Sequence, residues 1–293
     1  MGKILYYIFI FPVLLLVSLL PFFITYALSD FLYIIVFYVF GYRRKVVAQN
    51  LKNAFPEKTV SELKAIEKKY YHFLCDVMLE TIKSITISKK TMLNRCKMNE
   101  ASRVIFDQLN QQKQSCIIVL GHFGNWEWGG ISFSLTCKQQ LCVLYHPLSD
   151  KNFNNLMKNI RSRFGAKLYS MKDAIREMIK NKNEVTATAF IADQTPSPET
   201  AYWTTFLNQD TPVFLGTEKI AKKLNYPIVY GSINRIKRGY YEINVELICS
   251  NPQNTIEGEI TELHTKRLEK DIIAQPETWL WSHKRWKHKR KTA

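Results

Sequence analysis

The chain has 293 residues, with 41 Lys and Arg against 25 Asp and Glu, so its formal net charge is +16. This length suffices for one large domain or two small ones with a real hydrophobic core. The hydrophobic content of 46% excludes a disordered polyelectrolyte and, because most of the chain is polar, a polytopic membrane protein. The charge is unevenly placed, since Asp30 is the only charged residue between Lys3 and Arg43. An apolar front on a basic body is typical of a membrane-attached protein whose body meets something anionic.

The first predicted element is an uncleaved N-terminal membrane anchor. Ile4–Leu28 contains no charge, and 25 residues are enough for a helix that spans the bilayer, although Pro12 and Pro21 should bend it. The next apolar stretch, Phe31–Phe40, is too short to span alone. Basic residues from Arg43 onward then place the body in the cytoplasm by the positive-inside tendency. A signal peptide fits less well because the run is long and no small-residue cleavage site follows it. A buried core helix remains the alternative.

The rest of the chain predicts one α/β domain. We expect residues 1–42 to form the anchor and residues 43–293 to form a body with a basic, aromatic C-terminal tail. Short apolar runs that alternate with helical patterns indicate a mostly parallel sheet flanked by helices, with an antiparallel edge. The expected helices are a capped one from Thr59 to Lys83, then 151–163 and 171–180. The expected strands are 116–120, 141–145 and 185–192, and a hairpin of 227–233 with 240–247 that turns at Arg238-Gly239.

The six cysteines predict reduced thiols. They form no C-x-x-C pair and lie scattered on apolar runs, where Cys usually acts as a small buried hydrophobe. We therefore expect no disulfide and no zinc site.

The stretch from Gly121 to Gly130 is the strongest candidate for a reactive site. It holds four of the eleven glycines and begins where an apolar strand should end, the place where ligands bind in open α/β sheets. Asn125 is a good N-cap, so a helix is expected to begin there, with His122 in the preceding loop and Glu127 in the first turn. A loop histidine that folds back meets such a glutamate, which would orient the ring while its other nitrogen takes a proton.

Spacing alone leaves a plainer alternative open. His122 is then a strand-end histidine bonded to backbone, and Glu127 an ordinary first-turn acid. The flanking glycines and the Asn-Trp pair favour the catalytic interpretation, because glycines let backbone and a bulky chain approach closely, and the helix N-terminus stabilises a developing oxyanion.

These residues resemble a known family. G-H-F-G-N-W-E is similar to the H-x4-D/E block of acyltransferases, in the form found in the late (secondary) lipid A biosynthesis acyltransferases, the lauroyl and myristoyl transferases. Three later blocks agree in order along nearly the whole chain: an R-x-R block at Arg161 and Arg163, an aspartate block at Asp193-Gln194, and a closing P-x-x-W-x-W-x-H-x-R-W-K block from Pro276 to Lys287.

The resemblance implies a glycerolipid-acyltransferase-like fold and transfer of a fatty acyl chain from acyl carrier protein or coenzyme A to a hydroxyl of a lipid A precursor. In that chemistry His122 is the general base, Glu127 orients it, and neither metal nor cofactor is needed. The absence of G-x-S-x-G and H-E-x-x-H motifs agrees with this. It also implies substrate-binding roles for five residues: Asn125, Arg161, Arg163, Asp193 and Gln194.

Plainer interpretations of several of these residues stay open. Arg161 and Arg163 suit lipid phosphates, yet they would diverge on a helix, and the plain alternative is a solvated basic helix end. Asp193 is either a substrate contact or a turn residue before Pro196. Gln194 stands at a position that varies within the family, which leaves the acceptor lipid open.

The tail from His283 to Lys291 holds six Lys and Arg and no acid, with Trp279, Trp281 and Trp286 interleaved. Such a pattern suits single-stranded nucleic acid or an anionic membrane interface, and the anchor decides for the membrane. Acidic acyl carrier protein is a second candidate partner, and a solvated tail is the plain alternative for 287–293.

The sequence thus predicts an inner-membrane acyltransferase, single-pass or monotopic, with its catalytic domain on the cytoplasmic side and no nucleic acid partner. Two alternatives remain. One is an enzyme that acylates another glycolipid, phospholipid or amino-acid lipid. The other is a non-catalytic module that docks on anionic lipids.

Overall fold

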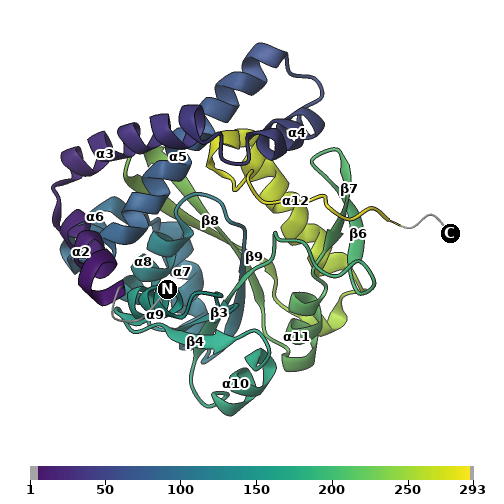
Figure 1. Ribbon diagram of the computed structural model, residues 1–293. Helices are drawn as coiled ribbons and strands as arrows, with labels where there is room; N and C mark the ends of the chain where they lie inside the picture. The colour runs from purple at the N-terminus through teal and green to yellow at the C-terminus, as the bar shows by residue number, and fades with distance from the viewer. Residues whose placement is uncertain (1–5, 291–293) are drawn as a thin grey trace.

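A seven-stranded sheet forms the centre of the computed structural model, which describes residues 6–290 (Figure 1). The strand order is β1-β9-β8-β2-β5-β3-β4. Strands β8, β2, β5, β3 and β4 run parallel, while β9 is antiparallel to β8 and carries β1 beside it as the edge strand. The strands are β1 Cys96–Met98, β2 Cys116–Leu120, β3 Gln140–Tyr145, β4 Lys167–Ser170, β5 Thr186–Ile191, β8 Ile228–Lys237 and β9 Tyr240–Cys249. The predicted α/β class and its antiparallel edge are confirmed.

The apolar composition of β2 explains its central place. Ile117 and Val119 lie in one buried cluster, and Ile118 lies in another, so side chains on both faces of the strand are covered. The hairpin of β8 and β9 also forms as predicted. Gly239 supplies the positive φ of +72° at its turn.

Helices cover both faces of the sheet (Figure 1). α7 and α8 pack on the Ile118 side, and α10, α11 and α12 pack on the Ile117 side. A separate hairpin of β6 and β7 lies against α12. The helices of the body are α4 Arg44–Ala54, α5 Val60–Lys83, α6 Lys89–Arg95, α7 Glu100–Gln111, α8 Trp126–Thr136, α9 Lys151–Ser162, α10 Ala174–Lys180, α11 Gly216–Leu224 and α12 Glu259–Ala274, with 3-10 turns at Pro252–Asn254 and Pro276–Thr278 and the small hairpin at β6 Tyr202–Phe206 and β7 Gln209–Val213.

The expected continuous helix over 4–28 is wrong. Ile4 lies outside the described residues, and the described part has a π-helical turn at Tyr6–Ile10, α2 at Phe11–Leu19, and a break at Leu20–Pro21. Proline lacks an N–H and clashes with the preceding turn, so the helix ends before it instead of bending through it. Lys83 and Thr86 donate to the carbonyl oxygen of Ser18 at this break, over 2.9 and 2.8 Å.

The longer apolar helix begins after the break. α3 at Phe22–Ile34 continues through a π-helical segment at Ile35–Val39, so the stretch expected to be too short belongs to a longer helix. Phe22–Val39 is the one helix of the described part that is long and apolar enough to cross a membrane, and length and composition are all that this rests on.

The burial pattern of α3 is inverted relative to a soluble helix. Its buried residues include Thr25 and Ser29, whereas Phe23 is 74% and Phe31 59% exposed. Ser29 donates to Asp76 on α5, and Arg238 bridges Asp76 to Asp30. The polar side of α3 therefore faces the body, and its apolar side faces outward.

Glu80 on α5 connects this helix to the centre of the fold. Its buried carboxylate accepts hydrogen bonds from Tyr26 of α3, from Asn125 and from Tyr241 of β9, over 2.7–2.8 Å. Burial raises the pKa of Glu80 to about 7, against the opposing effect of the hydrogen bonds from Tyr241, Tyr26 and Asn125.

The raised pKa of Glu80 predicts a pH-dependent stability. The pKa of Glu80 is about 7 in the folded protein and near 4.5 in the unfolded chain. The protonated carboxyl therefore contributes to stability below about pH 4.5, and this contribution is lost as the pH rises from 4.5 to 7. Glu80→Gln has no such proton to lose. The drop in thermal midpoint of the detergent-solubilised protein between pH 5 and pH 8 should thus be smaller in the variant than in wild type. Parallel curves for the two proteins would contradict the assignment.

Candidate functional site

The loop between β2 and α8 carries His122. β2 ends at Leu120 and α8 begins at Trp126, and the side-chain oxygen of Asn125 accepts from the backbone N–H of Trp128 at 3.0 Å, which confirms the predicted N-cap. The ring of Trp126 meets the His122 ring edge-on, with 5.0 Å between their centroids. His122 is thereby held at the carboxyl end of a central strand.

Two glycines make this loop possible. Gly124 has a φ of +64°, and a Cβ there would lie 1.7 Å from the carbonyl oxygen of Ile233. A Cβ on Gly121 would lie 2.8 Å from Leu268 and 3.2 Å from the carboxylate of Asp193. The glycines that marked this stretch in the sequence therefore serve close backbone approach.

The carboxylate beside His122 belongs to Asp193. β5 pairs with β2, and Asp193 lies just past the end of β5, so neighbouring strand ends bring the two residues together. One oxygen of Asp193 lies 2.6 Å from Nδ1 of His122, and the other accepts from the His122 backbone N–H and from Nε1 of Trp279, each at 2.8 Å.

The contacts of Asp193 determine its charge state. Burial alone would raise its pKa, but the charge and hydrogen bonds of His122 and the indole of Trp279 outweigh burial and hold the pKa at about 2. An ionised carboxylate only accepts hydrogen bonds, so Nδ1 of His122 is the donor. The other ring nitrogen, Nε2, is then left to act on the cleft that His122 lines.

Glu127 does not contact His122 by any hydrogen bond in the described structure. Its two oxygens accept from Nη2 and Nε of Arg161, over 2.6 and 3.0 Å, and its side chain is 6% exposed. A guanidinium at the end of α9 offers two parallel donors, which makes it a strong partner for a buried carboxylate. The expected His122–Glu127 pair is therefore replaced here by two separate pairs, His122–Asp193 and Glu127–Arg161.

The remaining predicted residues lie in different places. Nε2 of Gln194 is 3.4 Å from Nε2 of His122, beside the same cleft. Arg163 follows α9, diverges from Arg161, and donates to the carbonyl oxygen of Ser84 at 2.9 Å. Asn125 is fully buried between the first turn of α8 and Glu80, so its amide supports the loop.

Two cavities meet at this site. An open cleft of about 450 Å³ is lined by His122, Gln194 and side chains of α9, and a smaller apolar cavity of about 100 Å³ lies between α8 and the sheet. Both share Leu144, Arg161 and Ile191 in their walls. Arg161, paired with Glu127, thus lies in the wall that the open cleft shares with the apolar cavity.

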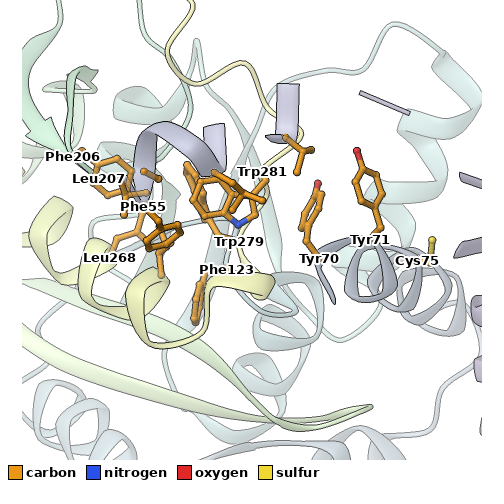
Figure 2. Close-up of a cluster of buried hydrophobic side chains, with 14 of the residues drawn as sticks. Phe55, Tyr70, Tyr71, Cys75, Phe123, Phe206, Leu207, Leu268, Trp279 and Trp281 are labelled. Carbon is orange, nitrogen blue, oxygen red and sulfur yellow. The ribbon is translucent and has the colours of Figure 1, made fainter. Parts of the chain in front are cut away.

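Two of the three tryptophans of the C-terminal segment are buried, and Trp286 is half-buried against them, contrary to the expectation of an interfacial tail. Trp279 and Trp281 are 2% and 0% exposed and lie in a cluster with Phe55 and Tyr70 (Figure 2). The backbone N–H of Leu280 donates to the carbonyl oxygen of His122 at 3.2 Å, so this segment also holds the loop between β2 and α8. The sequence did not reveal that this segment packs in the core, because the same tryptophan spacing occurs in buried and in interfacial segments. The end of the tail, 291–293, lies outside the described residues.

The six cysteines are free thiols, and the described residues contain no cluster of three or more His, Cys, Asp or Glu placed to hold a metal ion. Burial raises the pKa of Cys75, Cys116 and Cys137 to about 12 each, and it raises the pKa of Cys96 as well.

Comparison with known proteins identifies one family. The family model described as bacterial lipid A biosynthesis acyltransferase matches residues 3–288, which is nearly the whole chain. The search of curated proteins found no match to this chain.

Double-mutant cycles on thermal unfolding test the pairing. The His122→Ala/Asp193→Ala cycle and the Glu127→Ala/Arg161→Ala cycle should each show a coupling of about 0.5–3 kcal/mol, because each removes two groups that bond one another. The His122→Ala/Glu127→Ala cycle should be additive within about 0.5 kcal/mol. Strong coupling in that third cycle would restore the pair expected from the sequence.

Proposed function

Because the chain belongs to the bacterial lipid A biosynthesis acyltransferase family, we propose that it transfers a fatty acyl chain from a thioester donor to a hydroxyl of a lipid A precursor. The observation that carries the proposal is the bond between Nδ1 of His122 and ionised Asp193 at the edge of an open cleft. A non-catalytic lipid-binding module has no need of an oriented histidine, and the family is one of acyltransferases.

We propose that His122 is the general base. Nε2 takes the proton of the acceptor hydroxyl as its oxygen attacks the thioester carbonyl, and the imidazolium formed is stabilised by Asp193. Collapse of the tetrahedral intermediate breaks the carbon–sulfur bond, and His122 returns the proton to the leaving thiolate. The products are an ester and a free thiol, with no acyl-enzyme. In this proposal Asp193 takes the orienting role that was expected of Glu127.

The oxyanion of that intermediate needs a positive environment. The first N–H groups of any helix lack intrahelical partners, and those of α8 follow His122 by only a few residues. We therefore assign the oxyanion to this end of α8. Arg161 lies at the wall shared by the two cavities, but its charge is balanced by Glu127. Arg163, which is exposed, is then the better candidate of the two arginines for an anionic headgroup.

The apolar cavity suits the acyl chain of the donor. It begins at the shared wall of Leu144 and Ile191 and ends among buried side chains that include Phe106 and Phe133, which pack edge-on with centroids 4.8 Å apart. A chain inside it would place its thioester beside Arg161 and the cleft. Gly130 on α8 and Gly231 on β8 line the cavity, and because neither has a side chain, neither narrows it.

We further propose that the enzyme acts at the inner membrane, with α3 as its contact. The exposed Phe23 and Phe31 need an apolar environment, and the basic residues at the start of α4 follow at once on the cytoplasmic side. Acyl carrier protein is the proposed donor, with coenzyme A as the alternative, and the proposed transfer uses no cofactor of the enzyme's own. Another membrane glycolipid, phospholipid or amino-acid lipid remains the alternative acceptor.

Loss of the base tests the chemistry. The purified protein is incubated in detergent with a lipid A precursor and acyl carrier protein thioester, and the product is measured by mass spectrometry. His122→Ala and Asp193→Asn should each lower kcat/KM by about 10²-fold or more, the usual effect of losing a general base or its orientation. His288→Ala, a histidine of the tail, is the matched control and should keep wild-type activity. Full activity in His122→Ala would sink the mechanism.

The donor chain is tested at Gly130. A Cβ at this position would meet Leu141 at 3.8 Å, an ordinary contact, so Gly130→Ala should fold well and gain about 1 kcal/mol of helix propensity. Gly130→Leu should fill the cavity and shift the preferred donor to shorter chains. The measurement is kcat/KM across thioesters of graded length, with Gly130→Ala as control. A folded Gly130→Leu variant with the wild-type length profile would place the acyl chain elsewhere.

A further inference from the structure

Arg285 is a buried cation that forms no side-chain hydrogen bond through two of its nitrogens. It lies in the C-terminal segment after Trp281 and is 2% exposed, and within residues 6–290 its Nε and Nη1 atoms have no hydrogen-bond partner. An isolated buried charge costs several kcal/mol, so such a residue needs an opposite charge nearby.

The cavity that Arg285 lines contains that charge. Asp193 and His264 border the same small space of about 10 Å³, which admits about one water molecule. Nε2 of His264 and the hydroxyl of Thr265, which also lines the cavity, are likewise without partners among the described side chains. Burial lowers the pKa of His264 to about 4, so this histidine is neutral at pH 7. Burial also lowers the pKa of Arg285, to about 10, with Asp193 acting against the shift, so Arg285 stays charged.

We infer that Arg285 is a positioning residue whose buried charge, on the same small cavity as Asp193, lowers the pH at which the His122–Asp193 pair takes up a proton. This inference rests on the proposed role of His122 as general base. Arg285 touches neither the cleft wall nor the reacting atoms, so it acts through Asp193. Because its charge is shielded from solvent, its influence on the pair is far larger than that of an exposed lysine.

Other charged groups around the pair are already balanced or neutral. Glu127 and Arg161 neutralise each other in the cleft, and Tyr230 donates to Asp271, which pairs with Arg267. Burial lowers the pKa of His283 to about 4, so the histidine near Thr195 is neutral as well. Lys158 and His146 lie farther out, on the wall of the open cleft, where water screens them.

The unbonded nitrogens of Arg285 make the experiment selective. Since the proposed role needs charge and no bond through Nε or Nη1, Arg285→Lys should preserve it, whereas Arg285→Met removes the charge and keeps an unbranched chain of similar length. Exposed Lys284, its neighbour in the chain, provides the matched control Lys284→Met.

The readout is the pH profile of kcat/KM, which reports the titration of the free enzyme. Arg285→Met should move the acid limb up by about one pH unit, because a buried positive charge that favours the deprotonated pair has been removed. Arg285→Lys and Lys284→Met should leave the limb in place. Equal shifts in the Met and Lys variants, or no shift in a folded Met variant, would overturn the inference.

A second measurement separates this inference from the proposed function. Modification of His122 by diethyl pyrocarbonate, followed by mass spectrometry across pH, needs no substrate. Its midpoint should rise in Arg285→Met by the same amount. If no donor and acceptor react with wild type, the proposed function fails while this midpoint still tests Arg285. If Arg285→Met does not fold, Arg285→Gln takes its place in both measurements.

Discussion

The buried carboxylate of Asp193 is the contact on which the site depends. It joins three parts of the chain that are far apart in sequence: the end of β5, the loop that carries His122, and Trp279 of the C-terminal segment. The parallel pairing of β2 with β5 brings the first two together, and no choice of side chain would do so if those strands were not neighbours. Trp279 adds a donor that burial makes costly to leave unpaired. The C-terminal segment is thereby part of the site, and not an appendage to it.

A second buried carboxylate, that of Glu80, connects the site to the apolar helix α3. Glu80 holds Asn125, whose side chain caps α8, and it also holds Tyr26 of α3. An unbroken series of hydrogen bonds therefore runs from the apolar helix to the first turn of α8, four residues after His122. Asp76, one turn earlier on α5, binds the same helix through Ser29. Placing two carboxylates under an apolar helix makes its docking specific, because a misplaced helix would leave both unsatisfied.

The sequence predicted the parts whose signals are local. The all-apolar β2, the capping box at Thr59 and the N-cap at Asn125 all depend on neighbours within a few residues, and all were found. The break at Pro21 was misjudged because a helix can continue through a proline or end at it, depending on which donors reach the freed carbonyl groups. Here the donor is Lys83, which lies 63 residues from Leu20 and cannot be recognised from the local sequence. The partner of His122 was misassigned for a similar reason. Glu127 is near in sequence, while Asp193 is near only once the strand order is known.

The two carboxylates near His122 have different partners: Asp193 pairs with His122, and Glu127 pairs with Arg161. An unpaired Arg161 would set a full charge at the mouth of an apolar cavity, where it would oppose the entry of a hydrocarbon chain. Glu127 neutralises that charge with two hydrogen bonds while leaving the guanidinium in place. Had Glu127 bonded Nδ1 of His122 instead, Arg161 would need another anion and Asp193 would lose one of its three hydrogen-bond donors. In the proposed mechanism the glutamate of the H-x4-E block therefore contributes without touching the histidine, since Asp193 orients the base and Glu127 balances the charge of Arg161 beside the apolar cavity.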